Sequence, residues 1–386
     1  MKINFEGVAE FLTLGFTLNG KTMIKNFNIP TLPMPSFDIS PNQSTIDDVY
    51  QALTDSVRRS IRPNMALALS GGLDSRIIAG LIAECDKSIP AYTTGYSNME
   101  KKIAKKICSV LKLRHYTINC PTRLNEKSIE HVKEIVKKSG GVLPVNDIHN
   151  KIVIWNFLRE LNIKSILTAA MFDEITGGVF AYKITSMEDF CKLTIQSATH
   201  PILSQKYRKI TFKNLTKSCK GIEFRKLYAL VHVKNLRRDF KIKEWPETYQ
   251  PIIDSRVLST INSLPYKQQV SKHIQKKILR KYFPELYLIP YAKSMLPPFF
   301  PYIIHRKIRK PINVIHKYTH LEKPVPLLTF DVTYYIRNSI PLLRNILLKH
   351  PPPLLETLDI KKLIDNINTS NAILLSRLST YALLKE

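Results

Sequence analysis

Apolar and polar residues alternate along the first half of the chain in a pattern that predicts short buried strands separated by amphipathic helices. The apolar run Met65–Leu69 predicts the first of these strands. The spacing also predicts strands at 91–96, 115–118 and 165–168, with helices at 47–62, 76–83, 100–111, 130–138 and 151–161. This order predicts an α/β fold with a parallel sheet, helices on both faces, and ligands at the carboxyl ends of the strands.

Beyond about residue 180 the strand pattern fades, and the rest of the chain is predicted to be helical and interrupted by prolines. The three consecutive prolines at 351–353 predict a loop, and the residues from 354 to 384 predict terminal helices. The second half is therefore expected to be mostly helical.

The sequence Ser70-Gly71-Gly72-Leu73-Asp74-Ser75 lies between the first predicted strand and its helix. Backbone N–H groups at a helix N-terminus bind phosphate, and glycines let the backbone approach the ligand closely. Asp74 is placed to hold a metal ion beside the phosphates, and Ser75 to cap the helix or to donate to an oxygen. A turn that needs glycine for its shape alone is the alternative, but the whole string in this context favours phosphate binding. It is not a Walker loop, because no Gly-Lys-Ser/Thr follows.

A second motif follows the strand predicted at 165–168. The chain there reads Ala169-Ala-Met-Phe-Asp173-Glu174, and two further glycines stand at 177 and 178. Asp74 and Asp173 would lie at the ends of neighbouring strands, where two carboxylates can share Mg²⁺ ions that bridge ATP oxygens. The alternative is an acidic pair favoured by the dipole at a helix N-terminus. The position of Asp173 and Glu174 after a strand, at a fixed spacing before the two glycines, favours the metal site.

Composition restricts the class of protein and its partners. The 386 residues carry a net charge of +27, with basic blocks at 101–106, 267–281 and 305–317. Such charge favours association with polyanions, so nucleic acid is a possible partner, but apolar residues at helical spacing also fit solvated helix faces. The five scattered cysteines, the absence of a long apolar stretch and a start unlike a signal peptide lead us to expect a cytoplasmic protein without a membrane span.

The two motifs together resemble those of the PP-loop ATP pyrophosphatases. The Leu-Asp form of the first motif is most similar to the synthetase domain of the asparagine synthetase (glutamine-hydrolysing) family. The resemblance implies ATP and Mg²⁺ as cofactors and a small carboxylate, aspartate or an analogue, as substrate. It implies activation of that carboxylate as an acyl-adenylate, with release of pyrophosphate, and then attack by a nitrogen nucleophile that releases AMP. The nitrogen would come from ammonia, a separate glutaminase or an amine.

The resemblance also implies the site residues. Lys293 falls on the lysine that grips pyrophosphate in the family, and with Asp74 it is the candidate catalytic residue. Asp74 and Asp173 would hold the metal. The residues that would bind the nucleotide are Ser70, Gly71, Gly72, Asp74, Ser75, Gly95, Thr168 and Asp173.

The chain departs from the family pattern at two places. Ala169, Ala170 and Met171 stand where the family has glycine, an acidic residue and glycine, and Tyr249 stands in an arginine position of a third element, Glu247–Asp254. The acidic residue is thought to position or deprotonate the attacking nitrogen, which alanine cannot do. Two alternatives therefore stay open: an RNA-modifying PP-loop enzyme, and a catalytically degenerate relative that only binds nucleotide.

We expect three regions. Residues 1–45 resemble the linker before the synthetase domain, and the glutaminase domain that precedes it in the family is expected to be absent. Residues 46–300 are expected to form the PP-loop domain, and 301–386 a helical C-terminal extension.

Overall fold

The computed structural model describes most of the chain, with isolated residues between the longer ranges. Those ranges are 2–27, 43–95, 98–176, 185–198, 200–203, 205–222, 245–269, 272–291, 296–300, 332–353 and 357–386. The third basic block, at 305–317, lies outside the described residues.

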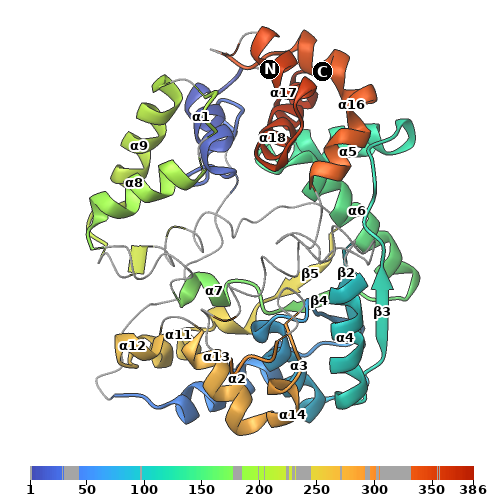
Figure 1. Ribbon diagram of the computed structural model, residues 1–386, viewed down its shortest axis with the longest axis vertical. Coiled ribbons are helices and arrows are strands. Elements are labelled where there is room, and N and C mark those ends of the chain that lie inside the picture. Colours follow the sequence, from blue (N-terminus) through green and yellow to red (C-terminus); the bar gives the residue numbers. More distant parts are fainter. Residues whose placement is uncertain are drawn as a thin grey trace.

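A five-stranded sheet forms the centre of one half of the molecule (Figure 1). All neighbouring strands are parallel, in the order β3-β2-β1-β4-β5. The α/β fold with a parallel sheet, predicted from the sequence, is confirmed. The strands are β1 (Met65–Ala68), β2 (Ala91–Thr94), β3 (His115–Ile118), β4 (Ser165–Thr168) and β5 (Glu247–Tyr249).

The fifth strand corrects the prediction that no strand follows residue 180. β5 pairs with β4 at the sheet edge, with Leu167 opposite Tyr249. Its three residues, Glu-Thr-Tyr, include two exposed side chains and no apolar run. The strand is therefore defined by its pairing with β4 and not by a hydrophobic pattern of its own.

Helices cover both faces of the sheet, as the sequence predicts. Side chains of successive strand residues point to opposite faces. Accordingly Met65 and Leu67 of β1 belong to one core, and Ala66 belongs to another. The first core is built mainly with α2 (Ile46–Ser60), α3 (Leu73–Cys85), α4 (Asn98–Leu111), α11 (Ser255–Asn262), α13 (His273–Tyr282) and α14 (Pro284–Tyr287), and the second with α6 (Val145–Glu160).

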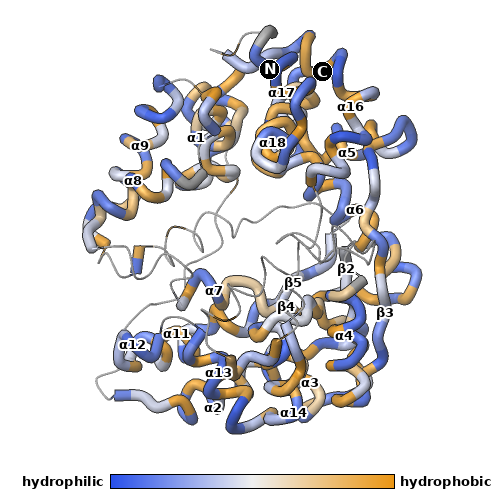
Figure 2. The backbone as a smooth tube through the Cα atoms, in the orientation of Figure 1, coloured by the Kyte–Doolittle hydropathy of each residue, from blue (hydrophilic) through white to orange (hydrophobic). Residues whose placement is uncertain are grey.

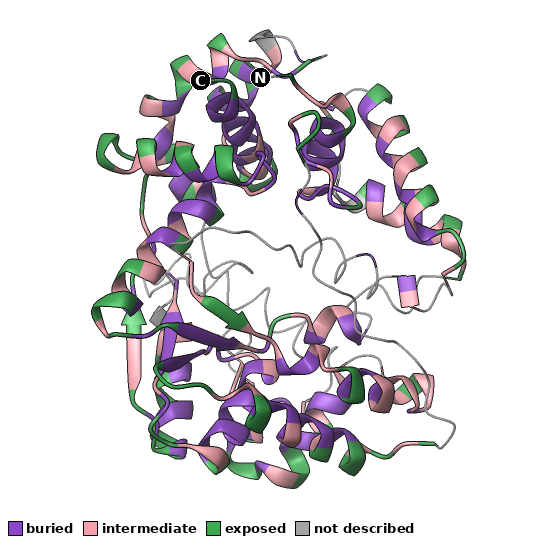
Figure 3. Ribbon diagram, turned by 180° about the vertical axis from the view of Figure 1, so that it is seen from behind, coloured by how far each residue is buried: buried purple, intermediate pink, exposed green. Residues whose placement is uncertain are grey.

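The other half of the molecule is a helical cluster that joins distant parts of the sequence. Its central helix, α18 (Thr369–Lys385), is buried along nearly its whole length, as Figure 3 shows, and its apolar residues are visible in Figure 2. Its buried polar residues are mostly small, and the Ser379 and Thr380 hydroxyls donate to carbonyls of the same helix one turn earlier. Helices packed against it include α1 (Phe5–Leu14), α5 (Glu126–Lys138), α16 (Val332–Lys349) and α17 (Thr357–Asp365).

The helical C-terminal half is thereby confirmed, whereas α1 is not among the helices that the sequence predicts. The helix α1 also packs against α8 (Met187–Ala198) and α9 (Gln205–Cys219) in a smaller core. The helix α6 connects the halves, because Ile148 lies in the helical cluster and Leu158 against the sheet. The two chain ends lie on the same side of the molecule (Figure 1). Within the described ranges, no helix is long and apolar enough to cross a membrane.

The basic blocks on α4 and α13 form solvated helix faces. On α4, Lys102 and Lys105 are exposed, while Ile103 and Ile107 are buried. The same division holds on α13, where Ile274 is buried and Lys277, Arg280 and Lys281 are exposed. Lys272, which directly precedes α13, has a different environment and belongs to the site described next.

Candidate functional site

The turn between β1 and α3 has a backbone that requires glycine. Gly71 has a φ of +73°, and a Cβ atom there would lie 3.1 Å from Cγ2 of Ile103. The helix α3 begins at Leu73, and Gly72, its N-cap, has no side chain to accept hydrogen bonds from the first turn. The N–H groups of that turn are thus not covered by a side-chain cap.

Two serines hold this turn in place. The Ser75 hydroxyl donates to the carbonyl of Gly72 at 3.0 Å and lies 3.1 Å from the hydroxyl of Ser70. Ser75 is buried, whereas Ser70 is exposed. The Ser75 hydroxyl therefore holds the backbone of the turn, and the hydroxyl of the exposed Ser70 contacts Ser75 and accepts from the Gly72 N–H.

The two aspartates predicted to share a metal lie on either side of one ammonium group. Nζ of Lys272 lies 2.8 Å from Oδ1 of Asp173 and 3.5 Å from Oδ2 of Asp74. The Gln275 amide donates to Oδ1 of Asp74 at 3.0 Å. Asp74 comes from the first turn of α3, and Asp173 from α7 (Phe172–Ile175), directly after β4. The structure thus brings these side chains together at the carboxyl ends of β1 and β4.

Burial governs the electrostatics of this cluster. Burial, together with the nearby charge of Asp173, raises the pKa of Asp74 to about 6, although Lys272 and Gln275 act in the opposite direction. Burial acts to lower the pKa of Lys272, but the two carboxylates outweigh it and raise that pKa above its usual value. Burial also raises the pKa of Glu174. The site is therefore an acidic pocket whose carboxylates are paired with the ammonium group of Lys272.

The donor set fits a metal that is shared with phosphate groups. Among the described residues there is no cluster of three or more His, Cys, Asp or Glu side chains that could hold a metal. Mg²⁺ is usually bound by one or two carboxylates together with phosphate oxygens and water. Asp74 and Asp173, which both contact the Lys272 ammonium, match that requirement.

The segment after β4 keeps a backbone shape that glycine adopts readily. Met171 has a φ of +76° and is the N-cap of α7. Side chains other than glycine rarely adopt this left-handed conformation. The hydroxyl of Thr168 accepts a hydrogen bond from the Ala170 N–H at 3.2 Å, which further fixes the turn.

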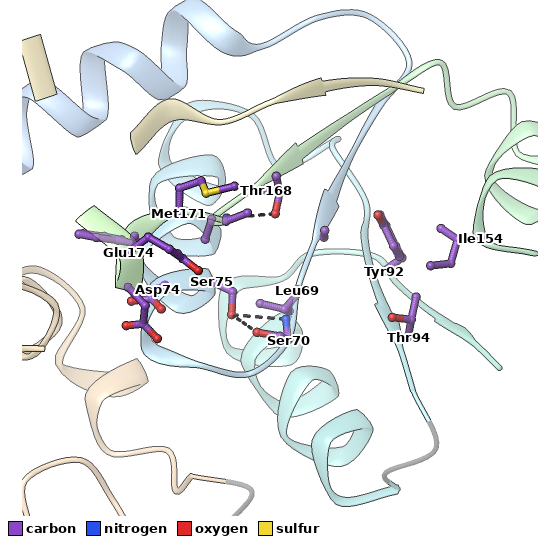
Figure 4. A pocket seen from close by; sticks show the side chains of 15 residues that line it. Leu69, Ser70, Asp74, Ser75, Tyr92, Thr94, Ile154, Thr168, Met171 and Glu174 are labelled. Carbon is purple, nitrogen blue, oxygen red and sulfur yellow. Dashed lines mark hydrogen bonds between the residues drawn. The ribbon is translucent and has the colours of Figure 1, made fainter. Parts of the chain in front are cut away.

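A cavity of about 400 Å³ extends from the turn between β1 and α3 along the strand ends. Figure 4 shows Asp74 and Glu174 at one end of it and Tyr92, Thr94 and Ile154 at the other. Gly95, with a φ of +132°, directly follows Thr94 at the end of β2. Residues between the two ends of the cavity include Ser70, Ser75, Thr168 and Met171.

Comparison with known families identifies the chain. The family model described as "Asparagine synthase" matches residues 48–247, more than half of the sequence. The chain belongs to the asparagine synthase family. The matched region runs from α2 to the first residue of β5 and so contains both motifs of the site.

Two solved structures share a likeness to part of this asparagine synthase family chain. Phosphoadenylyl-sulfate (PAPS) reductase from Candida auris is 15% identical with a TM-score of 0.22, covering 34% of this chain and 70% of that chain. NMN synthetase from Francisella tularensis is 14% identical with a TM-score of 0.23, covering 34% of this chain and 58% of that chain. This chain thus spans less than two thirds of the synthetase. No curated protein matches the sequence.

Several parts of the predicted site lie outside the described residues. These are Lys293 and the glycine pair at 177 and 178. At the third element, Tyr249 lies on β5 with the guanidinium carbon of Arg62 5.1 Å from its ring centroid. Asp254, the last residue of that element, caps α11 by accepting from the N–H of Arg256.

Sequence reasoning missed Lys272 and Gln275 as members of the site. Both lie in the basic block at 267–281, which shows helical spacing and was interpreted as a solvated face. Their partners Asp74 and Asp173 are far away in sequence, so only the fold brings them together. No local pattern in the sequence marks Lys272, because its two partners lie 198 and 99 positions away.

Proposed function

We propose that this member of the asparagine synthase family is an ATP-dependent, AMP-forming carbon–nitrogen ligase that activates a small carboxylate substrate. The observation that supports the proposal is the convergence of Asp74, Asp173 and Lys272 beside the Gly71 turn. N–H groups at a helix N-terminus that no side chain caps are suited to bind phosphate. The neighbouring carboxylates supply the ligands that Mg²⁺ takes when it binds with phosphates.

Each residue then has a defined task. The Ser70–Ser75 turn receives the β- and γ-phosphates, with the Ser70 hydroxyl as a further donor. Asp74 and Asp173 would hold Mg²⁺, which would neutralise phosphate charge. Lys272 contributes a mobile point charge beside the phosphates. Lys293 is proposed as a second lysine for the departing pyrophosphate, as the family resemblance implies.

The reaction has two steps. A carboxylate oxygen of the substrate attacks the α-phosphorus of ATP, and the bond between the α-phosphorus and the bridging oxygen breaks, releasing pyrophosphate. An amine or ammonia then attacks the carbonyl carbon of the acyl-adenylate. The carbon–oxygen bond to AMP breaks, an amide forms, and the nitrogen loses a proton. Glu174 lines the cavity, and burial raises the pKa of its carboxyl group, so we assign it to accept this proton.

A pyrophosphate-release assay tests the proposal. The purified protein is supplied with ATP, MgCl₂ and a panel of amino acids and other small carboxylates, with and without ammonium. We expect release that depends on one carboxylate, and amide formation that depends on a nitrogen source. Asp74→Asn should reduce the release at least 100-fold, because it removes a metal ligand beside the phosphates.

Asp86→Asn is the matched control, because Asp86 follows the opposite end of the same helix and its carboxylate accepts a hydrogen bond from the Ser88 N–H. Equal rates for Asp74→Asn and Asp86→Asn would contradict the proposed metal role. Release that occurs only with RNA would support an RNA-modifying enzyme. Nucleotide binding without release under any condition would support a degenerate relative.

A further inference from the structure

Arg76 is a fully buried cation at the back of the phosphate-binding turn. It lies in the first turn of α3 and donates only to backbone carbonyls. Its Nε donates to the carbonyl of Gly71 at 3.0 Å. Nη1 donates to the carbonyls of Leu286 and Ile289 at 3.0 and 2.5 Å, and Nη2 donates to that of Pro290 at 2.7 Å.

These contacts need a planar group with several donors. Burial lowers the pKa of Arg76 to about 10, and no carboxylate among the described residues forms a salt bridge with it. A buried charge is costly unless hydrogen bonds satisfy it, and here four carbonyls do so. A lysine ammonium lacks the fixed fork geometry that reaches carbonyls on both sides. The site therefore uses the shape of arginine, not only its charge.

The segment that Arg76 binds ends at Tyr291. The N–H of Tyr291 donates to the carbonyl of Leu296 at 3.0 Å. The Tyr291 ring centroid lies 5.7 Å from Cζ of Arg76. Burial raises the pKa of Tyr291 to about 12, and Lys272 and Asp74 are among the charges that act on it. Tyr291 is thus close enough to the carboxylate cluster to interact with it electrostatically.

A second contact on the same side of α3 supports this docking. Gly80 lies one helical turn after Arg76, and a Cβ atom there would lie 2.7 Å from Cε1 of Phe283. The missing side chain lets the residues just before α14 pack closely against α3. Arg76 and Gly80 together hold the 283–291 segment against the helix that begins at the phosphate-binding turn.

We propose that Arg76 is a positioning residue that locks the 286–291 segment onto the Gly71 turn. This inference rests on the proposed function, because the Gly71 turn is part of the proposed phosphate site. Arg76 does not touch the substrate. It keeps the turn and the segment that ends at Tyr291 in one fixed arrangement beside Asp74 and Lys272.

The first test measures anchoring and does not depend on catalysis. Hydrogen exchange is followed by mass spectrometry in the wild type, Arg76→Met and Arg377→Met. Arg377 is the matched control, because its guanidinium donates to the carbonyls of Leu12 and Thr13 in the helical cluster. We expect Arg76→Met to speed exchange at least 10-fold in 284–300, and Arg377→Met to do so only near α1. Unchanged exchange in 284–300 would overturn the inference even if the wild type proves to be an active ligase.

The second test separates positioning from a general loss of stability. Pyrophosphate release is measured for the same variants and Arg76→Lys, at a temperature where circular dichroism shows all of them folded. We expect kcat to fall at least 10-fold in Arg76→Met and Arg76→Lys, with KM for ATP changed less than threefold, and Arg377→Met to match the wild type. Faster exchange with unchanged kcat would overturn the positioning role. A wild type without release would instead refute the proposed function.

Discussion

Because the backbone of Met171 is left-handed, we predict that glycine stabilises the fold more than alanine does at this position, the reverse of their usual order in a helix. Replacing Met171 by either residue removes the same contacts of the long side chain, so comparing the two variants isolates the backbone. With a φ of +76°, alanine stays strained at this position and glycine does not. Left-handed backbone costs a residue with a Cβ atom about 1–2 kcal/mol, whereas glycine loses about 0.5–1 kcal/mol through the entropy of the unfolded chain.

The difference gives the expected magnitude. Met171→Gly should be more stable than Met171→Ala by about 1 kcal/mol. The assay is equilibrium unfolding in urea, followed by circular dichroism, with the midpoints compared at a common slope. Glu130 provides the control, because it is an exposed residue in the middle of α5. There Glu130→Ala should be more stable than Glu130→Gly by about 1 kcal/mol.

The difference in stability between the glycine and alanine variants must therefore have opposite signs at positions 171 and 130. If Met171→Ala were as stable as Met171→Gly or more so, the backbone at 171 would not be left-handed. The idea that this chain keeps a glycine-type turn under a new side chain would then be refuted.

Three further predictions concern the site and its support. Because the pKa of Asp74 is raised from 3.8 to about 6, the folded state binds more protons than the unfolded state in this window, and stability falls as pH rises through it. Asp74→Asn should lack that part of the pH dependence in urea titrations, and parallel curves for both proteins would contradict it. Lys272→Met removes the ammonium between Asp74 and Asp173, so MgCl₂ should raise its melting temperature more than that of the wild type. An equal rise in both would argue against a shared site. Gly80→Ala should destabilise the fold by about 1–2 kcal/mol through its clash with Phe283, and Phe283→Leu should restore most of that loss in the double variant. Additive losses in thermal unfolding would show that the two do not meet.

The sequence predicts those parts of the fold that local patterns determine. The strands β3 and β4 lie at the predicted residues, since short apolar or β-branched runs bounded by helices are distinctive. The turn at Gly71 is predicted because strand, glycines and helix follow one another directly. The edge strand β5 could not be predicted, because its pairing with β4 defines it.

The candidate site shows the same limit. Asp74 and Asp173 are found from motifs, but Lys272 joins them through the packing of α13 on α3, which no local pattern contains. The left-handed conformation of Met171 could not be predicted for another reason, because methionine rarely adopts it. In the sequence Arg76 is an ordinary helix residue, because its contacts with the 286–290 segment arise only in the fold.

The packing of α1 against α18 has a consequence for synthesis in the cell. Leu14 and Thr369 are 355 positions apart, so α1 leaves the ribosome long before its partner exists. At about 5–20 residues per second the delay is roughly 20–70 s. Throughout that time Val8, Phe11 and Leu12, which are buried in the finished core, have no completed partner surface to cover them. The nascent chain is therefore expected to depend on chaperones until translation of α18 is complete.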